Sequence, residues 1–194
     1  MSAFRIGELD AVLIHIPKTG GTSLRKGTFS DIEGPYYGEL PPHFAPYFKF
    51  AFVREPINRF LSCVSMFKFG TIDEDGTSRR SGTQDFTIEK AIEILGSPGL
   101  RYDENRKTYE EKFLHHALPM AHPFNQISEA NFVGRFEQFT NDFNQVCKLC
   151  GLTPIPALPV LHSSKQVIDA SSLTKRQIKI LQEYYEQDYR MFNY

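Results

Sequence analysis

The chain has 194 residues, 41% of them hydrophobic and 23% charged, and a net charge of −1. This length predicts one domain over residues 1–194, large enough to bury a substantial core. The near-neutral charge argues against recruitment of nucleic acid or an anionic membrane, so an anion site has to be local. Three cysteines form no disulfide framework, and no apolar run reaches the roughly 18 residues of a membrane span. We therefore expect a cytoplasmic protein with no nucleic-acid partner and no membrane span.

The first predicted element is a buried strand at residues 11–16, AVLIHI, a short apolar run rich in β-branched residues. A glycine turn occupies 17–21, and Thr22 or Ser23 can cap the helix expected after it. Residues 28–47 carry many glycines and prolines, a composition typical of a loop with little regular structure.

A second buried strand is predicted at 48–53, FKFAFV, and a helix should begin at Pro56, because proline suits the first helical turn. Residues 70–84 are polar and punctuated by glycine, which predicts a mobile surface loop. Two further helices are expected, over 86–95 and over roughly 102–117.

The C-terminal part continues this alternation. A short strand is predicted at 131–134, a helix at about 138–150 that ends at Gly151, and an amphipathic helix over 173–189. Strands that alternate with helices indicate an α/β fold with a central parallel sheet flanked by helices.

The turn PKTGGTS has the composition of an anion site at a helix N-terminus. Unpaired backbone N–H groups there attract anions, and Gly20 and Gly21 let the main chain approach an oxyanion closely. Lys18 adds a mobile charge, but it precedes the glycines, whereas the Walker A loop places its lysine after them. Three hydroxyl donors complete the set: Thr19, Thr22 and Ser23.

Two stretches together carry a family resemblance. IHIPKTGGTSL resembles the 5′-phosphosulfate loop of sulfotransferases, especially the carbohydrate-type group with the heparan-sulfate uronosyl enzymes. FAFVREPINRFLSCV resembles the 3′-phosphate segment of the same family, a strand and an arginine followed by a serine eight positions later, here Arg54 and Ser62. VGRFEQFTNDFNQVCKLCGL and LPVLHSSK resemble two downstream stretches of the family.

The resemblance implies a P-loop-like three-layer α/β fold and a sulfotransferase that uses 3′-phosphoadenosine 5′-phosphosulfate (PAPS) as donor, with no metal. It also implies a hydroxyl acceptor, a sugar or a glycolipid. Lys18 would neutralise charge on the bridging oxygen, and an arginine at a strand end can bind phosphate bidentately. The residues expected to bind the donor are Lys18, Thr19, Gly20, Gly21, Thr22, Ser23, Arg54 and Ser62.

The general base is less well defined. In the uronosyl enzymes a histidine after a glycine fills this role, in a loop before the second strand, and here YYGELPPH puts Glu39 at that position. His43 lies four residues on and is the better base by its ordinary pKa, whereas a glutamate needs burial to raise its own. Glu39 and His43 are the two main candidates. The alternatives are Glu33, His115, His116 or a reaction without a side-chain base.

Other assignments stay open. A small-molecule kinase or nucleotidase with a variant loop would need Mg²⁺ and an acidic residue at a strand end. A non-catalytic nucleotide-binding module would tolerate Glu39 in place of the histidine. The soluble catalytic part of a membrane-anchored lumenal enzyme is the alternative to a cytoplasmic protein. The CKLC sequence at 147–150 lies in a helical pattern, and we expect both cysteines to pack in the core.

Overall fold

A computed structural model describes residues 2–72, 78–97, 108–154, 163–164 and 167–194. The described chain separates into two compact units, one within Met1–Arg54 and Met120–Leu161, the other within Glu55–Pro119 and His162–Tyr194. The single domain expected over 1–194 stays a prediction, and each unit is described by itself.

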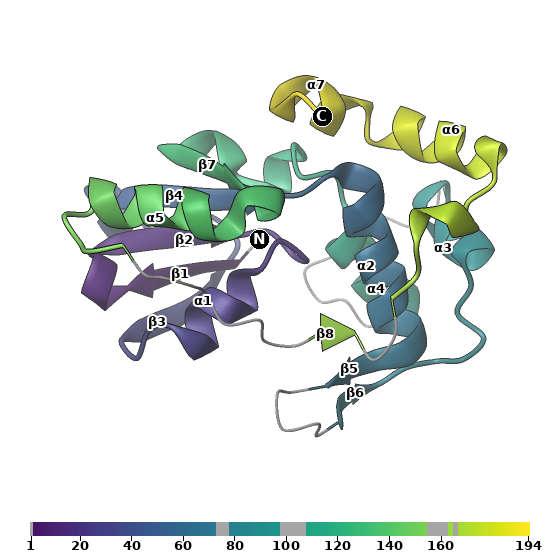
Figure 1. Cartoon of the computed structure of the whole chain (residues 1–194), viewed down its shortest axis with the longest axis horizontal. Coiled ribbons are helices and arrows are strands. Elements are labelled where there is room, and N and C mark those ends of the chain that lie inside the picture. The colour runs from purple at the N-terminus through teal and green to yellow at the C-terminus, as the bar shows by residue number, and fades with distance from the viewer. Residues whose placement is uncertain (1, 73–77, 98–107, 155–162, 165–166) are drawn as a thin grey trace. The chain divides into compact units, whose positions relative to one another are not determined.

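The first unit is built on a five-stranded sheet in the order β3-β1-β2-β4-β7 (Figure 1). Its strands and helices are β1 (Ser2–Ile6), β2 (Ala11–His15), α1 (Gly21–Gly27), β3 (Ile32–Tyr37), β4 (Phe48–Val53), β7 (Phe132–Arg135) and α5 (Phe139–Leu149). β2, β4 and β7 are parallel, whereas β1 pairs antiparallel with both β2 and β3. The α/β class is therefore confirmed. Three neighbouring strands are parallel, and β1, which runs in the opposite direction, joins them to β3 in a mixed sheet.

The loop predicted over 28–47 is wrong for residues 32–37, which form the edge strand β3. Gly34 and Pro35 suggested a loop, but an edge strand tolerates proline because one row of its N–H groups needs no partner. The neighbouring strand β1 was not predicted, because Ser2–Ile6 is short and contains Arg5. Pairing with β2 and β3 on either side makes it a strand.

One hydrophobic cluster of this unit fills one face of the sheet. Leu13 of β2 lies beside Phe50 of β4 and points to the same face as Phe52. Leu24 of α1 and Phe143 of α5 pack into the same cluster, so both helices cover this face. At about 25 cal/mol per Å² of buried apolar surface, these fully buried side chains stabilise the sheet and fix the two helices on it.

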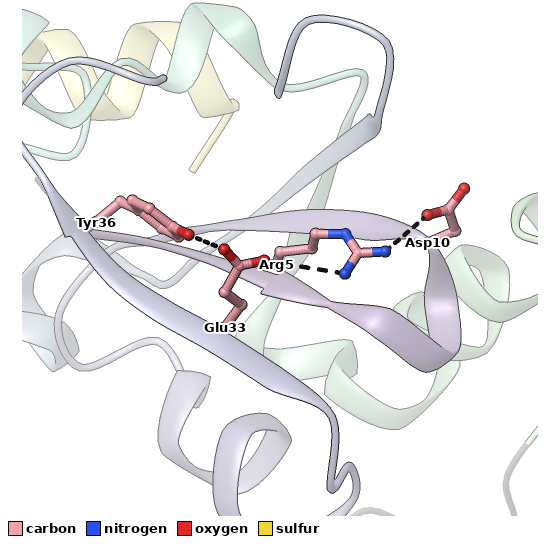
Figure 2. A network of polar contacts seen from close by, with 4 residues as sticks. All are labelled: Arg5, Asp10, Glu33 and Tyr36. Carbon is pink, nitrogen blue, oxygen red and sulfur yellow. Dashed lines mark hydrogen bonds and ion pairs between the residues drawn. The ribbon is translucent and has the colours of Figure 1, made fainter. Parts of the chain in front are cut away.

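A polar network crosses the β1–β3 edge of the sheet (Figure 2). The Arg5 guanidinium lies 3.3 Å from the Asp10 carboxylate and 3.9 Å from that of Glu33. The Tyr36 hydroxyl donates to Glu33. This hydrogen bond raises the pKa of Tyr36, so the phenol keeps its proton near neutral pH.

Glu8 holds the chain that leads into β3. Its Oε1 accepts from the Ser30 N–H at 2.8 Å, the Ser30 hydroxyl at 2.9 Å and the Asp31 N–H at 3.0 Å. Desolvation would raise the pKa of Glu8, but the N–H groups of Asp31 and Ser30 outweigh it and lower the pKa to about 2.

We expect Glu8→Gln to lower the free energy of unfolding by about 1 kcal/mol at pH 7, a value discounted because the carboxylate is exposed. The folded pKa lies below the ordinary 4.5, so this stabilisation is complete above that pH and disappears as the pH falls towards about 2. Urea unfolding of both proteins across this pH range measures it. Glu129→Gln, an exposed glutamate of the same unit, is the control, and a constant difference between wild type and Glu8→Gln at all pH values would contradict the assignment.

The second unit combines helices with a three-stranded sheet in the order β6-β5-β8. Its elements are α2 (Pro56–Phe69), β5 (Gly70–Ile72), β6 (Ser78–Ser81), α3 (Ile88–Leu95), α4 (Tyr109–Ala117), β8 (Ser163–Ser164), α6 (Lys175–Tyr184) and α7 (Glu186–Phe192). The predicted helix start at Pro56 is confirmed. The loop predicted over 70–84 is wrong for β5 and β6, because β5 also pairs with β8 from far along the chain. Residues 73–77 of that loop and 102–107 of the predicted fourth helix lie outside the described residues.

Arg59 joins the helices of this unit. Its side chain is fully buried and donates to the carbonyls of His116, Ala117 and Leu118, where α4 ends. Tyr185 separates α6 from α7 and donates its hydroxyl to Ala117 at 2.7 Å. These donors satisfy carbonyls that a helix C-terminus otherwise leaves without a partner.

Candidate active site

The candidate site lies where the three parallel strands of the first unit end. Carboxyl ends of neighbouring parallel strands meet at one sheet edge, the usual place for ligands in α/β folds. Ile14 of β2 pairs with Ala51 of β4, and Val53 of β4 pairs with Arg135 of β7. The segments after these strands carry Lys18, Arg54 and Phe136, respectively.

The turn after β2 has a constrained backbone. Lys18 has φ 69° and Gly20 has φ 87°, both in the left-handed region. This region suits glycine but costs a lysine about 1–2 kcal/mol. The Thr19 hydroxyl donates to the Ile16 carbonyl at 2.8 Å and closes the turn. Lysine in such a conformation is a feature typical of functional sites, where strain persists because the surroundings impose it.

Gly20 is the N-cap of α1, and the Ser23 N–H donates to its carbonyl at 3.0 Å. The helix predicted after the turn therefore starts at Gly21, inside the glycine pair. The predicted cap at Thr22 or Ser23 is wrong, because both residues lie within the helix and no side chain caps it. The N–H groups of this first turn are the ones a helix leaves for an anion.

Both glycines are required by close packing. A Cβ on Gly20 would lie 2.6 Å from Cζ of Phe139, and one on Gly21 would lie 2.2 Å from Cδ2 of His15. The His15 ring that lies against Gly21 has its Nδ1 3.1 Å from the Ser2 hydroxyl.

We expect Gly20→Ala to lower the free energy of unfolding by about 2–4 kcal/mol, because it combines left-handed strain with a clash against the Phe139 ring. Gly151→Ala is the matched control, since Gly151 has φ 74° but no atom within 4 Å of an added Cβ. That variant should lose only about 1–2 kcal/mol. Denaturant unfolding compares them, and equal losses would show that close packing at Gly20 contributes nothing.

Arg54 follows β4 and reaches the turn after β2. Its Nη1 donates to the Lys18 carbonyl at 3.4 Å, and its Cζ lies 4.5 Å from the centroid of the Phe136 ring. Its own N–H donates to the sulfur of Met120 at 3.4 Å. The structure thus brings Lys18 and Arg54 together at one sheet edge.

The other residues that were predicted to bind the donor differ in burial and in the unit that carries them. Thr19 and Ser23 are buried, and Thr22 is half-buried on the first turn of α1. Ser62 lies half-buried on α2, in the second unit. Glu55, which follows Arg54, uses its carboxylate to cap α2, accepting from the N–H groups of Ile57 and Asn58.

The two candidate bases lie between β3 and β4, and both are exposed. The segment that carries Glu39 is held by Gln126, which accepts from the Leu40 N–H at 3.1 Å and donates to the Gly38 carbonyl at 3.0 Å. The His43 ring packs edge-on against Phe44, with 4.5 Å between centroids. The sequence did not indicate this role for Gln126, because Gln126 lies more than 80 positions from residues 38–40 and no local pattern links them.

Metal and thiol chemistry have little support among the described residues. No group of three or more His, Cys, Asp or Glu side chains in that part of the chain could hold a metal ion. Cys147 is buried and Cys150 half-buried, both as free cysteines. Burial raises the pKa of each thiol, which disfavours the reactive thiolate. The expected core packing is confirmed for Cys147, whereas Cys150 is only half-buried.

The family assignment rests on a match to residues 37–194, described as the sulfotransferase family. The chain belongs to the sulfotransferase family. It is therefore a transferase that moves a sulfuryl group from a sulfonate donor to an acceptor. No curated protein and no solved structure matches the chain.

Within this sulfotransferase, the matched segment includes Glu39, His43, Arg54 and Ser62, whereas the turn at 17–23 precedes it. The stretch LPVLHSSK at 158–165 lies largely outside the described residues. In the described part of the sulfotransferase, no helix combines the length and apolar character needed to cross a membrane.

Proposed function

We propose that this sulfotransferase transfers the sulfuryl group of PAPS to a hydroxyl acceptor by in-line displacement. In this proposal the turn at 17–23 binds the phosphosulfate end of the donor and Arg54 binds the 3′-phosphate. The contact between the Arg54 guanidinium and the Lys18 carbonyl carries the argument. PAPS carries its 3′-phosphate and its 5′-phosphosulfate on the same ribose, so its two binding segments have to be neighbours.

The chemistry follows from these positions. The acceptor oxygen forms a bond to sulfur while the bond between sulfur and the bridging oxygen breaks, and adenosine 3′,5′-bisphosphate leaves. Negative charge develops on the bridging oxygen. The Lys18 ammonium and the N–H groups at the start of α1 neutralise it without reorganisation. Thr22 and Ser23 lie on the same helical turn, and the resemblance alone assigns Ser62 to the 3′-phosphate.

The acceptor must lose a proton as its oxygen attacks sulfur, and Glu39 and His43 are the proposed bases. Both are exposed in the segment between β3 and β4. The acceptor class, a sugar or a glycolipid, rests on the resemblance to carbohydrate sulfotransferases.

Ligand-induced thermal stabilisation tests the donor. Adenosine 3′,5′-bisphosphate at 100 times its Kd should stabilise the protein by about 2.7 kcal/mol in the presence of EDTA, because it binds only the folded state. ATP with Mg²⁺ is the comparison. A protein that ATP stabilises only with Mg²⁺, and that the bisphosphate leaves unchanged, would be a kinase or nucleotidase instead. Mass spectrometry of acceptor mixtures incubated with isotopically labelled PAPS then identifies the acceptor, and stabilisation without transfer would indicate a binding module.

We expect removal of the true base to lower kcat by about 100- to 10,000-fold while donor affinity stays unchanged. Glu39→Gln and His43→Ala separate the two candidates, because each removes one base and leaves the other. Transfer rates at saturating PAPS, measured from pH 5 to pH 9, provide the comparison. Full activity in both variants would eliminate both residues.

A further inference from the structure

The aromatic residues beside Arg54 have no function assigned by the sequence or by the family. Phe136 follows β7 directly, and its ring lies under the Arg54 guanidinium, 4.5 Å from Cζ to the centroid. Phe139 starts α5 and packs against Phe136, with 5.7 Å between ring centroids. Phe139 also packs against Gly20, where an added Cβ would lie 2.6 Å from Phe139 Cζ.

These contacts link Arg54 to the glycine turn by two routes. Arg54 touches the turn directly through the Lys18 carbonyl and indirectly through Phe136, Phe139 and Gly20. Phe139 is itself fixed by the buried Phe52, at 4.7 Å between centroids. The arginine and the glycine turn therefore share one aromatic support.

The backbone that presents Phe136 is also held in place. The Arg135 N–H donates to the Asp142 carboxylate of α5 at 2.6 Å. Gly134, one residue earlier, packs so closely on Phe52 that a Cβ would lie 2.6 Å from that ring. The bend from β7 into α5 is thus constrained on both sides.

We propose that Phe136 is a positioning residue for donor recognition, which holds the Arg54 guanidinium in the orientation that binds the 3′-phosphate. This inference rests on the proposed donor. An arginine has a flexible side chain, and its planar guanidinium binds phosphate well only when its plane is correctly oriented. A ring face under that plane fixes it through cation–π attraction and leaves the N–H edge directed outward.

Phe136→Leu keeps an apolar side chain but removes the ring face. We expect its Kd for adenosine 3′,5′-bisphosphate to rise about 3- to 30-fold, as loss of a cation–π contact predicts. Its Kd for adenosine 5′-phosphate, which lacks the 3′-phosphate, should stay within about twofold, and Phe136→Tyr should restore wild-type affinity for both because its ring face remains. Isothermal titration calorimetry measures all of these values.

Two controls make the test specific. Phe132→Leu removes a nearby ring of β7 that packs on the core, and should leave both affinities unchanged. In the Arg54→Ala background, Phe136→Leu should cause no further loss of bisphosphate affinity, because the guanidinium that it holds is absent.

The proposal is overturned if Phe136→Leu weakens both nucleotides equally, if Phe136→Tyr fails to restore affinity, or if the losses in the double variant add. If the wild-type protein binds the two nucleotides equally, the 3′-phosphate assignment itself fails, and the role of Phe136 fails with it. That result is seen before any variant is measured.

Discussion

Replacement of Lys18 by asparagine should lower kcat by about 100- to 1,000-fold without lowering the stability of the protein. In the proposed mechanism the Lys18 ammonium neutralises the leaving oxygen, so we expect the rate to fall when it is lost. Stability should stay constant or rise by up to about 1 kcal/mol, because Lys18 has φ 69° and asparagine tolerates the left-handed region better than lysine does. Opposite effects on activity and stability are the signature of strain kept for function.

Single-turnover transfer from PAPS and denaturant unfolding measure the two effects separately. Lys18→Arg retains the charge and should keep more activity than Lys18→Asn. Lys148→Asn, on the exposed side of α5, is the control for loss of a positive charge elsewhere in the same unit. A kcat within threefold of wild type for Lys18→Asn would exclude Lys18 from the transition state.

Substitution of Arg54 by alanine should raise the Kd for adenosine 3′,5′-bisphosphate about 10- to 100-fold, the effect expected for loss of charge-assisted hydrogen bonds to a phosphate. Adenosine 5′-phosphate should lose much less affinity. Some loss is expected even for this ligand, since Arg54 also donates to the carbonyl of Lys18 and so supports the phosphosulfate turn.

Arg54→Lys refines the result, because lysine retains the charge but not the planar fork. It should bind the bisphosphate with intermediate affinity and with a stronger dependence on salt than wild type. Arg135→Ala, the arginine at the end of β7, is the matched control for removal of a neighbouring guanidinium. If Arg54→Ala keeps the full preference for the bisphosphate, the 3′-phosphate is bound elsewhere.

Local sequence predicted the strands that carry the site. AVLIHI and FKFAFV are continuous apolar runs, and they form β2 and β4 almost to the residue. Such runs must be buried on both faces, and a central parallel strand is the element that achieves this. The helix after β4 was also predicted, because proline at 56 marks a helix start. A helix was expected after β2 as well, but it begins at Gly21, earlier than a cap at Thr22 or Ser23 would place it.

Strands that lack an apolar run of their own were not predicted. Residues 32–37 contain Gly34 and Pro35 and become a strand only because β1 pairs with them. Residues 70–72, Gly-Thr-Ile, open a polar stretch punctuated by glycine and become a strand only between β6 and β8. Local composition contains no information about such partners, so a segment of this kind looks like a loop.

By itself, the sequence determined the residue types of the glycine turn at 17–23 and the position of Arg54 at the end of a later strand. Those properties depend on residue type and local spacing, which the turn PKTGGTS and the strand before Arg54 display directly. The tertiary structure alone decided that Arg54 bonds to the carbonyl of a residue 36 positions earlier and lies on the ring of Phe136. Those contacts depend on the parallel register of β2, β4 and β7, which arises from packing in the shared core.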